Sequence, residues 1–233
     1  MEFAQVVFYG RLGKQALSMF NLDPQQWRGA RVLDCPGGPG SLSAVLRADG
    51  FDVTAVDPLY ALAEDSLKQR ALADLDRAMG QLAGDPAIRP GFDLAACRQE
   101  HLAALDVFLA DRRANPDRYI AASLPALPFA DQQFDLVLSG HLLFSYASMA
   151  DGGLMPAEGL DLAWHHRALA ELLRVSRRAV RLYPAHTIER QARRHPFAES
   201  LLAELPPRWS GRFASTPYDQ GHDGQTEVLE LHR

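Results

Sequence analysis

The hydrophobic pattern of the chain alternates between short apolar runs and longer segments with helical spacing. In the clearest example, a strand-like run at 31–35 meets the breaker cluster 36–40, and a helical pattern follows over 41–50. A second strand-like run at 52–56 ends at Asp57. Short apolar runs bounded by glycine and proline are typical of buried strands, and apolar residues three and four apart indicate a helix. This stretch therefore predicts two parallel strands joined by a helix.

Short apolar runs and segments with helical spacing continue to alternate over the rest of the chain. We expect Ser41 to cap the first helix and Gly50 to end it. Further strands are predicted at 118–122, 134–139 and 179–183, and two extended runs near the C-terminus, 208–214 and 227–231, indicate a hairpin. Further helices are predicted at 61–82, 94–113, 142–148, 161–175 and 194–205. Asp161 is the expected N-cap of the fourth of these helices.

This order of elements predicts the fold class and the domain organisation. Strands that alternate with helices favour an α/β fold, a Rossmann-like doubly wound sheet that is mostly parallel and ends in an antiparallel C-terminal strand hairpin. We expect a single domain over 1–233 with an N-terminal helical segment at 1–27. The stretch 61–117 is far longer than the dozen or so residues a crossover needs. We interpret it as a helical insertion between the second and third strands that acts as a lid or shapes the substrate site.

Composition narrows the class of protein. The 233 residues are 47% hydrophobic, which supports a proper core, and no apolar run approaches the roughly 20 residues of a membrane helix. The start of the chain lacks the pattern of a secretory signal, and two cysteines make no disulfide framework, so we expect a cytoplasmic protein. A net charge of −5 makes a nucleic-acid partner unlikely. We expect a monomer or a homodimer that acts on a small molecule.

The chemistry of the first stretch points to a nucleoside ligand. Glycines in 36–40 permit positive φ and a close approach of a ligand to the backbone. A right-handed crossover places this turn beside the end of the second strand, where Asp57 can accept two hydrogen bonds from a ribose diol. An NAD(P) fingerprint would need a third glycine where Ser43 stands, and Asp34 would repel a pyrophosphate. An NAD(P)-linked oxidoreductase nevertheless remains an alternative. A P-loop is excluded because no Lys-Ser/Thr pair follows the glycines.

Three blocks of sequence resemble the class I S-adenosylmethionine-dependent methyltransferases, and most closely the broad type 11 group that acts on small molecules. Residues 32–40, VLDCPGGPG, are similar to the family's first motif. Asp57 matches its ribose-binding acid, and residues 127–137, LPFADQQFDLV, resemble its block before the fourth strand. The C-terminal hairpin also looks like the family. The resemblance implies a methyltransferase with S-adenosylmethionine as cofactor. We expect no metal, because no cysteine or histidine spacing in the chain suggests a zinc site.

The resemblance also assigns residues to the cofactor. Asp34 would lie near the methionine amino group, Asp57 would hold the ribose, Pro58 and Leu59 would flank the adenine, and Ser123 would meet its edge. The complete set of cofactor-binding residues that it implies is Asp34, Pro36, Gly38, Gly40, Asp57, Pro58, Leu59, Ser123, Leu124 and Gly140. Two features depart from the family. Pro36 and Pro39 remove backbone donors from the turn, and Ser123 stands where the family often has an aspartate.

Catalysis needs little from the protein, because the sulfonium already activates the methyl group. His141 follows the fourth strand at the substrate-facing edge and is the candidate catalytic base, with a structural or capping role as the alternative. Tyr146 and Tyr183 are further candidates for the pocket wall, and Phe8 or Tyr9 for its closure. A third function class stays open beside the two enzymes, namely a protein that binds the cofactor without catalysis as a sensor or partner subunit.

Overall fold

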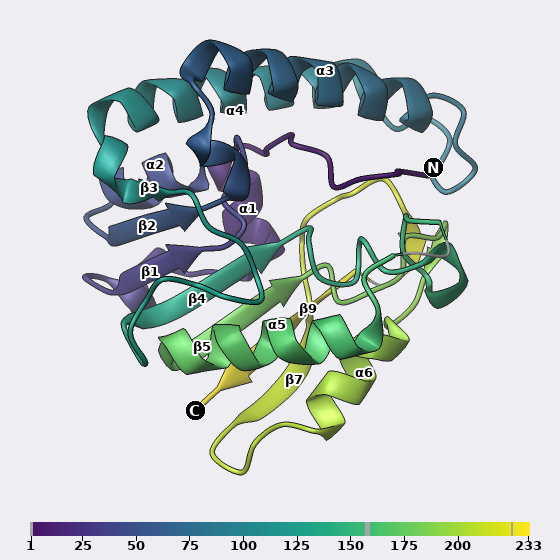
Figure 1. Ribbon diagram of the computed structural model, residues 1–233. Coiled ribbons are helices and arrows are strands. Elements are labelled where there is room, and N and C mark those ends of the chain that lie inside the picture. The colour runs from purple at the N-terminus through teal and green to yellow at the C-terminus, as the bar shows by residue number, and fades with distance from the viewer. Residues whose placement is uncertain (1, 157–158, 225) are drawn as a thin grey trace.

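The computed structural model describes residues 2–156, 159–224 and 226–233 (Figure 1). The strands are β1 (Arg31–Asp34), β2 (Asp52–Val56), β3 (Tyr119–Ile120), β4 (Phe134–Gly140), β5 (Ser176–Tyr183), β6 (Gln191–Ala192), β7 (Ser210–Ser215), β8 (Asp223–Gly224) and β9 (Glu227–His232). The α-helices are α1 (Gly13–Met19), α2 (Leu42–Ala48), α3 (Glu64–Leu82), α4 (Leu94–Ala114), α5 (Leu162–Val175) and α6 (Pro196–Ala203). Short 3-10 helices lie at η1 (Pro24–Trp27), η2 (Pro58–Ala61), η3 (Pro116–Arg118) and η4 (Met149–Asp151).

Seven strands form one sheet in the order β3-β2-β1-β4-β5-β9-β7. The first five run parallel, and β9 pairs antiparallel with both β5 and β7. The order reverses between β1 and β4, which in an open α/β sheet places a crevice at the carboxyl ends of these strands. The predicted fold class, a Rossmann-like sheet with an antiparallel C-terminal hairpin, is confirmed.

Helices cover both faces of the sheet (Figure 1). On one face, Leu169 and Leu172 of α5 and Leu201 of α6 pack against Val137 and Val180 of the sheet. On the other face, α1 and α2 pack against β1, β2 and β4 through a second apolar cluster. β4 is buried on both sides along nearly its whole length, because it lies at the centre of the sheet between these two layers.

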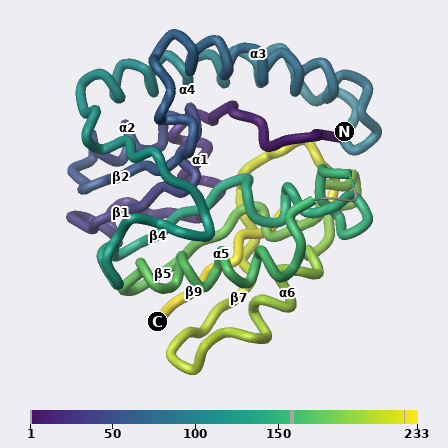
Figure 2. Tube along the Cα trace, viewed as in Figure 1, coloured from purple at the N-terminus to yellow at the C-terminus, as the bar shows by residue number. Residues whose placement is uncertain are grey.

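Helices α3 and α4 form an antiparallel pair between β2 and β3 and lie above the edge of the sheet in Figure 2. Their apolar faces meet around Phe108, which stacks on Tyr60 at 5.8 Å and meets Tyr119 edge-on at 5.5 Å between ring centroids. Arg47 of α2 pairs with Asp111 of α4 and ties the pair to the sheet. Among the described residues, no helix combines the length and the apolar character that crossing a bilayer requires.

Several local expectations differ from the structure. The N-terminal segment expected to be helical over 1–27 is helical only at 13–19 and 24–27, and residues 2–12 are not helical because their backbone groups bond distant partners instead. Met1 lies outside the described residues. The third strand has two residues, Tyr119 and Ile120, in place of 118–122. The region 142–148 forms turns rather than a helix.

Of the helix caps expected from the sequence, two are found in the structure and one is not. Asp161 caps α5 through a hydrogen bond from the Trp164 N–H at 2.6 Å, and Gly50 follows α2 with φ of +86°, so both expectations are confirmed. The cap expected from Ser41 is wrong, because its side chain makes no bond to its own helix. The Ser41 hydroxyl instead accepts a hydrogen bond at 2.8 Å from the Gly13 N–H, which begins α1.

Candidate functional site

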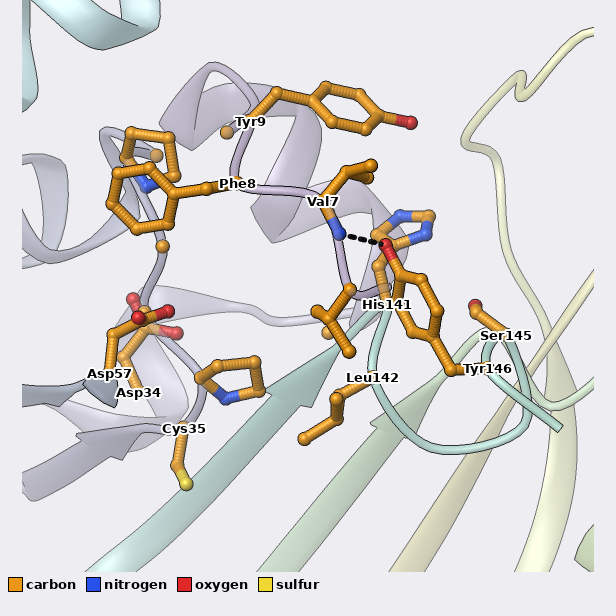
Figure 3. A pocket seen from close by; sticks show the side chains of 18 of the residues that line it. Val7, Phe8, Tyr9, Asp34, Cys35, Asp57, His141, Leu142, Ser145 and Tyr146 are labelled. Atoms are coloured by element: carbon orange, nitrogen blue, oxygen red, sulfur yellow. Dashed lines mark hydrogen bonds between the residues drawn. The ribbon is translucent and has the colours of Figure 1, made fainter. Parts of the chain in front are cut away.

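A cavity of about 450 Å³ opens at the carboxyl ends of β1, β2 and β4. This volume lies in the range of small-molecule and cofactor sites. Every residue that the sequence assigned to the cofactor lines it, and so does His141. Figure 3 shows Asp34 and Asp57 close together at one end of the cavity and His141, Ser145 and Tyr146 at the other. The structure therefore brings the predicted residues into one site, whose two ends differ in chemistry.

The glycine turn after β1 forms one wall of the cavity. Its Gly37 N–H donates to the carbonyl of Val56 at 2.8 Å, and Tyr60 donates its hydroxyl to the carbonyl of Gly38 at 2.7 Å. A side-chain carbon at Gly37 would meet the Tyr60 oxygen at 2.5 Å, whereas at Gly38, with φ of +53°, it would meet no atom within 4 Å. Gly37 is therefore required by packing under the turn, and Gly38 leaves the turn open toward the cavity.

Asp34 ends β1 and is buried beneath this turn. The Ser43 hydroxyl donates to its carboxylate at 3.1 Å. Burial raises the pKa of Asp34 to about 7, opposed by this hydrogen bond and by the Arg47 charge, with a further upward contribution from Asp57. A carboxyl group in this state gains most from a cationic or donor ligand that would hold it ionised.

Asp57 follows β2 and is also buried. Its Oδ1 accepts a hydrogen bond at 2.9 Å from the Leu59 N–H, so Asp57 caps the short helix η2. This capping role is compatible with ligand binding, because a carboxylate has several acceptor positions. Burial raises the pKa of Asp57 to about 6, although the Leu59 and Gly38 amides and Arg70 oppose the rise.

The cavity wall between the carboxylates and β4 is largely apolar. Pro58 and Leu59 line it from η2, and Ser123 and Leu124 line it from the loop after β3. Gly140 ends β4, and a side-chain carbon there would meet the Phe20 ring at 3.2 Å. A flat ring system fits between such walls, since it needs apolar faces and few polar partners.

The far end of the cavity is formed by residues after β4. His141 has φ of +54° and its N–H donates to the Tyr183 carbonyl at 2.6 Å. Its Nε2 lies 3.3 Å from the sulfur of Met19, and its ring meets Tyr183 edge-on at 5.2 Å. Burial, followed by the charge of Arg11, holds the pKa of His141 well below its usual value. Tyr146 lines the same end, whereas Tyr183 packs behind His141 and is not part of the cavity lining.

Comparison with known proteins adds evidence on the fold. No protein-family model matches the chain. A protein of Methanocaldococcus jannaschii described as uncharacterized is 24% identical over 239 residues, which cover 100% of this chain and 99% of the relative. Magnesium protoporphyrin IX methyltransferase (ChlM) from Synechocystis PCC 6803 with bound SAH has a TM-score of 0.50 at 14% identity, over 95% of this chain and 84% of ChlM. The N-methyltransferase NodS from Bradyrhizobium japonicum WM9 also has a TM-score of 0.50, at 9% identity, over 95% of this chain and 93% of NodS.

The strand order and these two similarities agree. The chain has the class I S-adenosylmethionine-dependent methyltransferase fold. This confirms the fold that the sequence motifs implied. In this fold the glycine turn after β1 and the acid after β2 both lie at the crevice along the carboxyl edge of the parallel sheet.

The roof of the cavity in this methyltransferase fold comes from the N-terminal segment, residues 2–12. The Phe8 N–H donates to Asp74 of α3 at 2.8 Å, and the Val7 N–H donates to the Tyr146 hydroxyl at 3.1 Å (Figure 3). The Phe3 N–H bonds the Leu154 carbonyl at 2.9 Å. The segment therefore bridges the helical insertion and the loops after β4. Its cavity-lining residues are Phe3, Val6, Val7, Phe8, Tyr9, Gly10 and Arg11, whereas the stretch 61–117 supplies Arg70.

Sequence reasoning named Phe8 and Tyr9 from this roof and missed the others. Gly10 is the most constrained of them, because a side-chain carbon there would lie 2.0 Å from the Gly40 nitrogen and 2.2 Å from the Pro39 carbonyl carbon. The backbone of the roof thus rests directly on the glycine turn. Nothing in the sequence near Gly10 marks this contact, since it joins residues 30 positions apart through backbone atoms alone.

We expect Gly10→Ala to destabilise the protein by about 1–3 kcal/mol, because the added methyl group must push the roof off the glycine turn. Urea unfolding followed by circular dichroism measures this. Gly80→Ala in α3 is the matched control: a side-chain carbon there meets nothing within 4 Å, and alanine should stabilise the helix by about 0.5–1 kcal/mol. An unfolding free energy unchanged in Gly10→Ala would contradict the close packing of roof and turn.

The raised pKa of Asp34 predicts a proton exchange on ligand binding. A cationic amine placed beside Asp34 favours its ionised form, so binding of S-adenosylhomocysteine should release a fraction of a proton near pH 7, because burial raises the pKa of the free carboxyl to about 7. Affinity should then rise as pH increases through about 7. The folding stability of the ligand-free protein should follow the opposite trend. Because the pKa of Asp34 is higher in the folded than in the unfolded state, stability falls as pH rises above the unfolded-state pKa.

Isothermal titration calorimetry in buffers of different ionisation enthalpy measures this proton release. Asp34→Asn is the control, since it has no proton to lose and should show none. Proton uptake, or a release that persists in Asp34→Asn, would contradict the prediction.

Among the described residues, no group of three or more histidine, cysteine, aspartate or glutamate side chains could hold a metal ion.

Proposed function

We propose that the protein transfers a methyl group from S-adenosylmethionine to a small-molecule acceptor. The observation that carries the proposal is that Asp34 and Asp57, at the ends of neighbouring parallel strands, border one cavity. Two neighbouring carboxylates at one end of the cavity suit two polar groups of one nucleoside cofactor, an ammonium at Asp34 and a ribose diol at Asp57. ChlM, which shares the fold, was crystallised with bound SAH.

The residues present fit this cofactor. Buried carboxyl groups with raised pKa values gain from a ligand that supplies a positive charge and hydroxyl donors. Gly38 leaves the turn open to a close approach of the ligand. Pro36 and Gly40 shape the same turn, and Pro58, Leu59, Ser123, Leu124 and Gly140 form the walls for the adenine. A dinucleotide fits less well, because the Asp34 carboxylate would face a pyrophosphate.

When bound, the cofactor supplies an electrophilic methyl group on sulfur, and the transfer breaks the carbon–sulfur bond as the acceptor bonds the same carbon. The protein orients the acceptor and excludes water through its apolar roof. His141 is our candidate for accepting the proton that the acceptor loses, since its lowered pKa keeps the imidazole neutral. We propose that the insertion 61–117 acts through the roof, because Asp74 of α3 holds Phe8.

We further propose a cellular compartment, an acceptor class and an oligomeric state for the protein. Both Cys35 and Cys97 are free thiols, which suits a reducing cytoplasm. The net charge of −5 and the cavity volume of about 450 Å³ suit a small-molecule acceptor rather than a nucleic acid. We also propose that the protein is a monomer or a homodimer.

Two measurements test the proposal. Calorimetry should show binding of S-adenosylhomocysteine and none of NADH, and the reverse result would support an NAD(P)-linked oxidoreductase instead. Purified protein should then transfer tritiated methyl groups to members of a panel of small phenols, amines and carboxylic acids. Tight S-adenosylhomocysteine binding without transfer to any member would favour a cofactor-binding sensor or partner subunit.

A further inference from the structure

One cation in the cavity wall lacks a counter-ion. Arg11, on the roof segment, lines the cavity. Its Nε–H donates to the Tyr218 hydroxyl at 2.9 Å, and its guanidinium carbon lies 5.5 Å from the Tyr9 ring centroid and 5.9 Å from that of Tyr218. Over the residues that the structure describes, no carboxylate lies within ion-pair distance of Arg11. Its two terminal nitrogens therefore keep their hydrogen-bonding capacity for a ligand.

The other arginine that lines the cavity differs in this respect. The guanidinium of Arg70 pairs with Asp74 of its own helix at 2.7 Å, so its charge is already compensated. The acidic residues that line the cavity, Asp34 and Asp57, lie beyond ion-pair distance of Arg11. A partly buried cation without a counter-ion is unfavourable for folding, and two tyrosine faces offset only part of that penalty. Such a group is better explained by a ligand than by stability.

A second polar group at the same end also lacks a partner. Ser145 is 2% exposed and lines the cavity, and its hydroxyl has no hydrogen-bond partner in the described part of the chain. Figure 3 shows Ser145 beside Tyr146 and near His141. Arg11 is linked to this end by contacts, because its partner Tyr218 meets Tyr183 edge-on at 5.9 Å, and Tyr183 meets His141 at 5.2 Å between ring centroids. A guanidinium and a free hydroxyl set among apolar walls are suited to an anionic group on a mostly apolar molecule.

We propose that Arg11 is the carboxylate-binding residue of the cavity, with the Ser145 hydroxyl as a further donor. The inference rests on the proposed function, in which two carboxylates can reach this position. One is the carboxylate of the cofactor's methionine moiety, and the other is an acidic group on the methyl acceptor. Because Arg11 is carried by the roof segment, whose Arg11 carbonyl accepts a hydrogen bond from the Ser41 N–H at 3.0 Å, the bound anion also holds the roof against the glycine turn.

The first arm of the test concerns the cofactor. S-adenosylhomocysteine and its decarboxylated analogue, which keeps the ammonium and lacks the carboxylate, are titrated into wild type, Arg11→Met and Arg11→Gln. If the cofactor supplies the anion, both variants lose at least ten-fold in affinity for S-adenosylhomocysteine and little for the analogue. Arg11→Gln retains a donor for Tyr218, so it covers the case in which Arg11→Met does not fold.

The second arm concerns the acceptor. Benzoate, naphthalene-2-carboxylate and biphenyl-4-carboxylate, each with its neutral carboxamide, are titrated into the complex with S-adenosylhomocysteine. If the acceptor supplies the anion, at least one acid binds ten-fold or more tighter than its amide, and Arg11→Met removes that preference. Arg98→Met is the matched control in both arms: Arg98 lies on α4, is 40% exposed and does not line the cavity, so its loss should leave the preference for the carboxylate unchanged.

The outcomes separate the inference from the function beneath it. A wild-type protein that fails to bind S-adenosylhomocysteine refutes the proposed function itself. A protein that binds it, but whose Arg11 variants discriminate carboxylates as well as wild type does in both arms, overturns the inference alone. The same holds if wild type shows no carboxylate preference in either arm.

Discussion

Replacing Asp57 with alanine should weaken the binding of S-adenosylhomocysteine by about 2–5 kcal/mol, which is roughly 30-fold to several thousand-fold. The ribose diol would lose a buried acceptor, and its two donors would be left without partners away from water. Asp57 is buried at the end of β2 and borders the cavity, so water cannot replace it at low energetic cost. Isothermal titration calorimetry with the purified variant measures the loss.

The variant should still fold. The variant loses the hydrogen bond from the Leu59 N–H by which Asp57 caps η2, which costs about 1 kcal/mol. It also loses a buried carboxyl group whose raised pKa indicates an unfavourable environment, and this offsets part of the cost. Asp57→Asn, which keeps one acceptor, should lie between wild type and Asp57→Ala. Asp76→Ala is the surface control, since the Asp76 side chain is 64% exposed on α3. A folded Asp57→Ala protein with wild-type affinity would refute the ribose assignment.

The part of the site that the sequence predicted is the part built from local pattern. The run 31–57 forms β1, α2 and β2 as expected, and the handedness of that crossover alone places Asp34 beside Asp57. Their convergence on one cavity needed no knowledge of long-range contacts. The same applies to Gly140 and His141, because residues that end a central parallel strand must reach the same edge of the sheet.

The part that the sequence could not predict depends on contacts between distant residues. The periodic apolar positions near the N-terminus resemble a helix, but Phe8 enters the cluster of α3 and α4 and its N–H bonds Asp74, 66 positions away. Tertiary packing therefore overrides local propensity along 2–12. Serine is a residue type that often caps helices, but α1 lies so close that the Ser41 hydroxyl accepts a hydrogen bond from the Gly13 N–H instead. Arg11 carries no sequence signal, since its missing counter-ion becomes visible only in the folded chain.

The helix expected at 142–148, which the structure replaces with turns, illustrates a further limit. The apolar residues after His141 have a spacing that suits a helix, but His141 and Phe144 both adopt positive φ, at +54° and +67°. Non-glycine residues rarely take this conformation, and it ends regular structure wherever it occurs. Here it turns the chain sharply after β4 and directs Tyr146 under the roof, where its hydroxyl meets Val7. The irregular backbone is what gives the cavity its second end.

His141→Gln should lower kcat by about 10²- to 10⁴-fold for an acceptor that must lose a proton, which is the usual contribution of a general base. The lowered pKa of His141 gives a specific pH profile. A base whose pKa is depressed stays neutral as pH falls, so kcat should remain level from pH 8 to below 6.5. By contrast, kcat/KM for S-adenosylmethionine should fall below pH about 7, because Asp34 of the free protein becomes protonated there.

Steady-state kinetics with an acceptor returned by the transfer screen, recorded from pH 5.5 to 8.5, measures both profiles. His166→Gln is the matched control, since this side chain lies on α5, is 36% exposed and should leave kcat and its pH dependence unchanged. His141→Gln must also bind S-adenosylhomocysteine as wild type does, which separates a chemical role from a collapsed cavity. If kcat survives in His141→Gln, the imidazole serves only to pack against Met19 and Tyr183, and proximity to the sulfonium is sufficient for transfer.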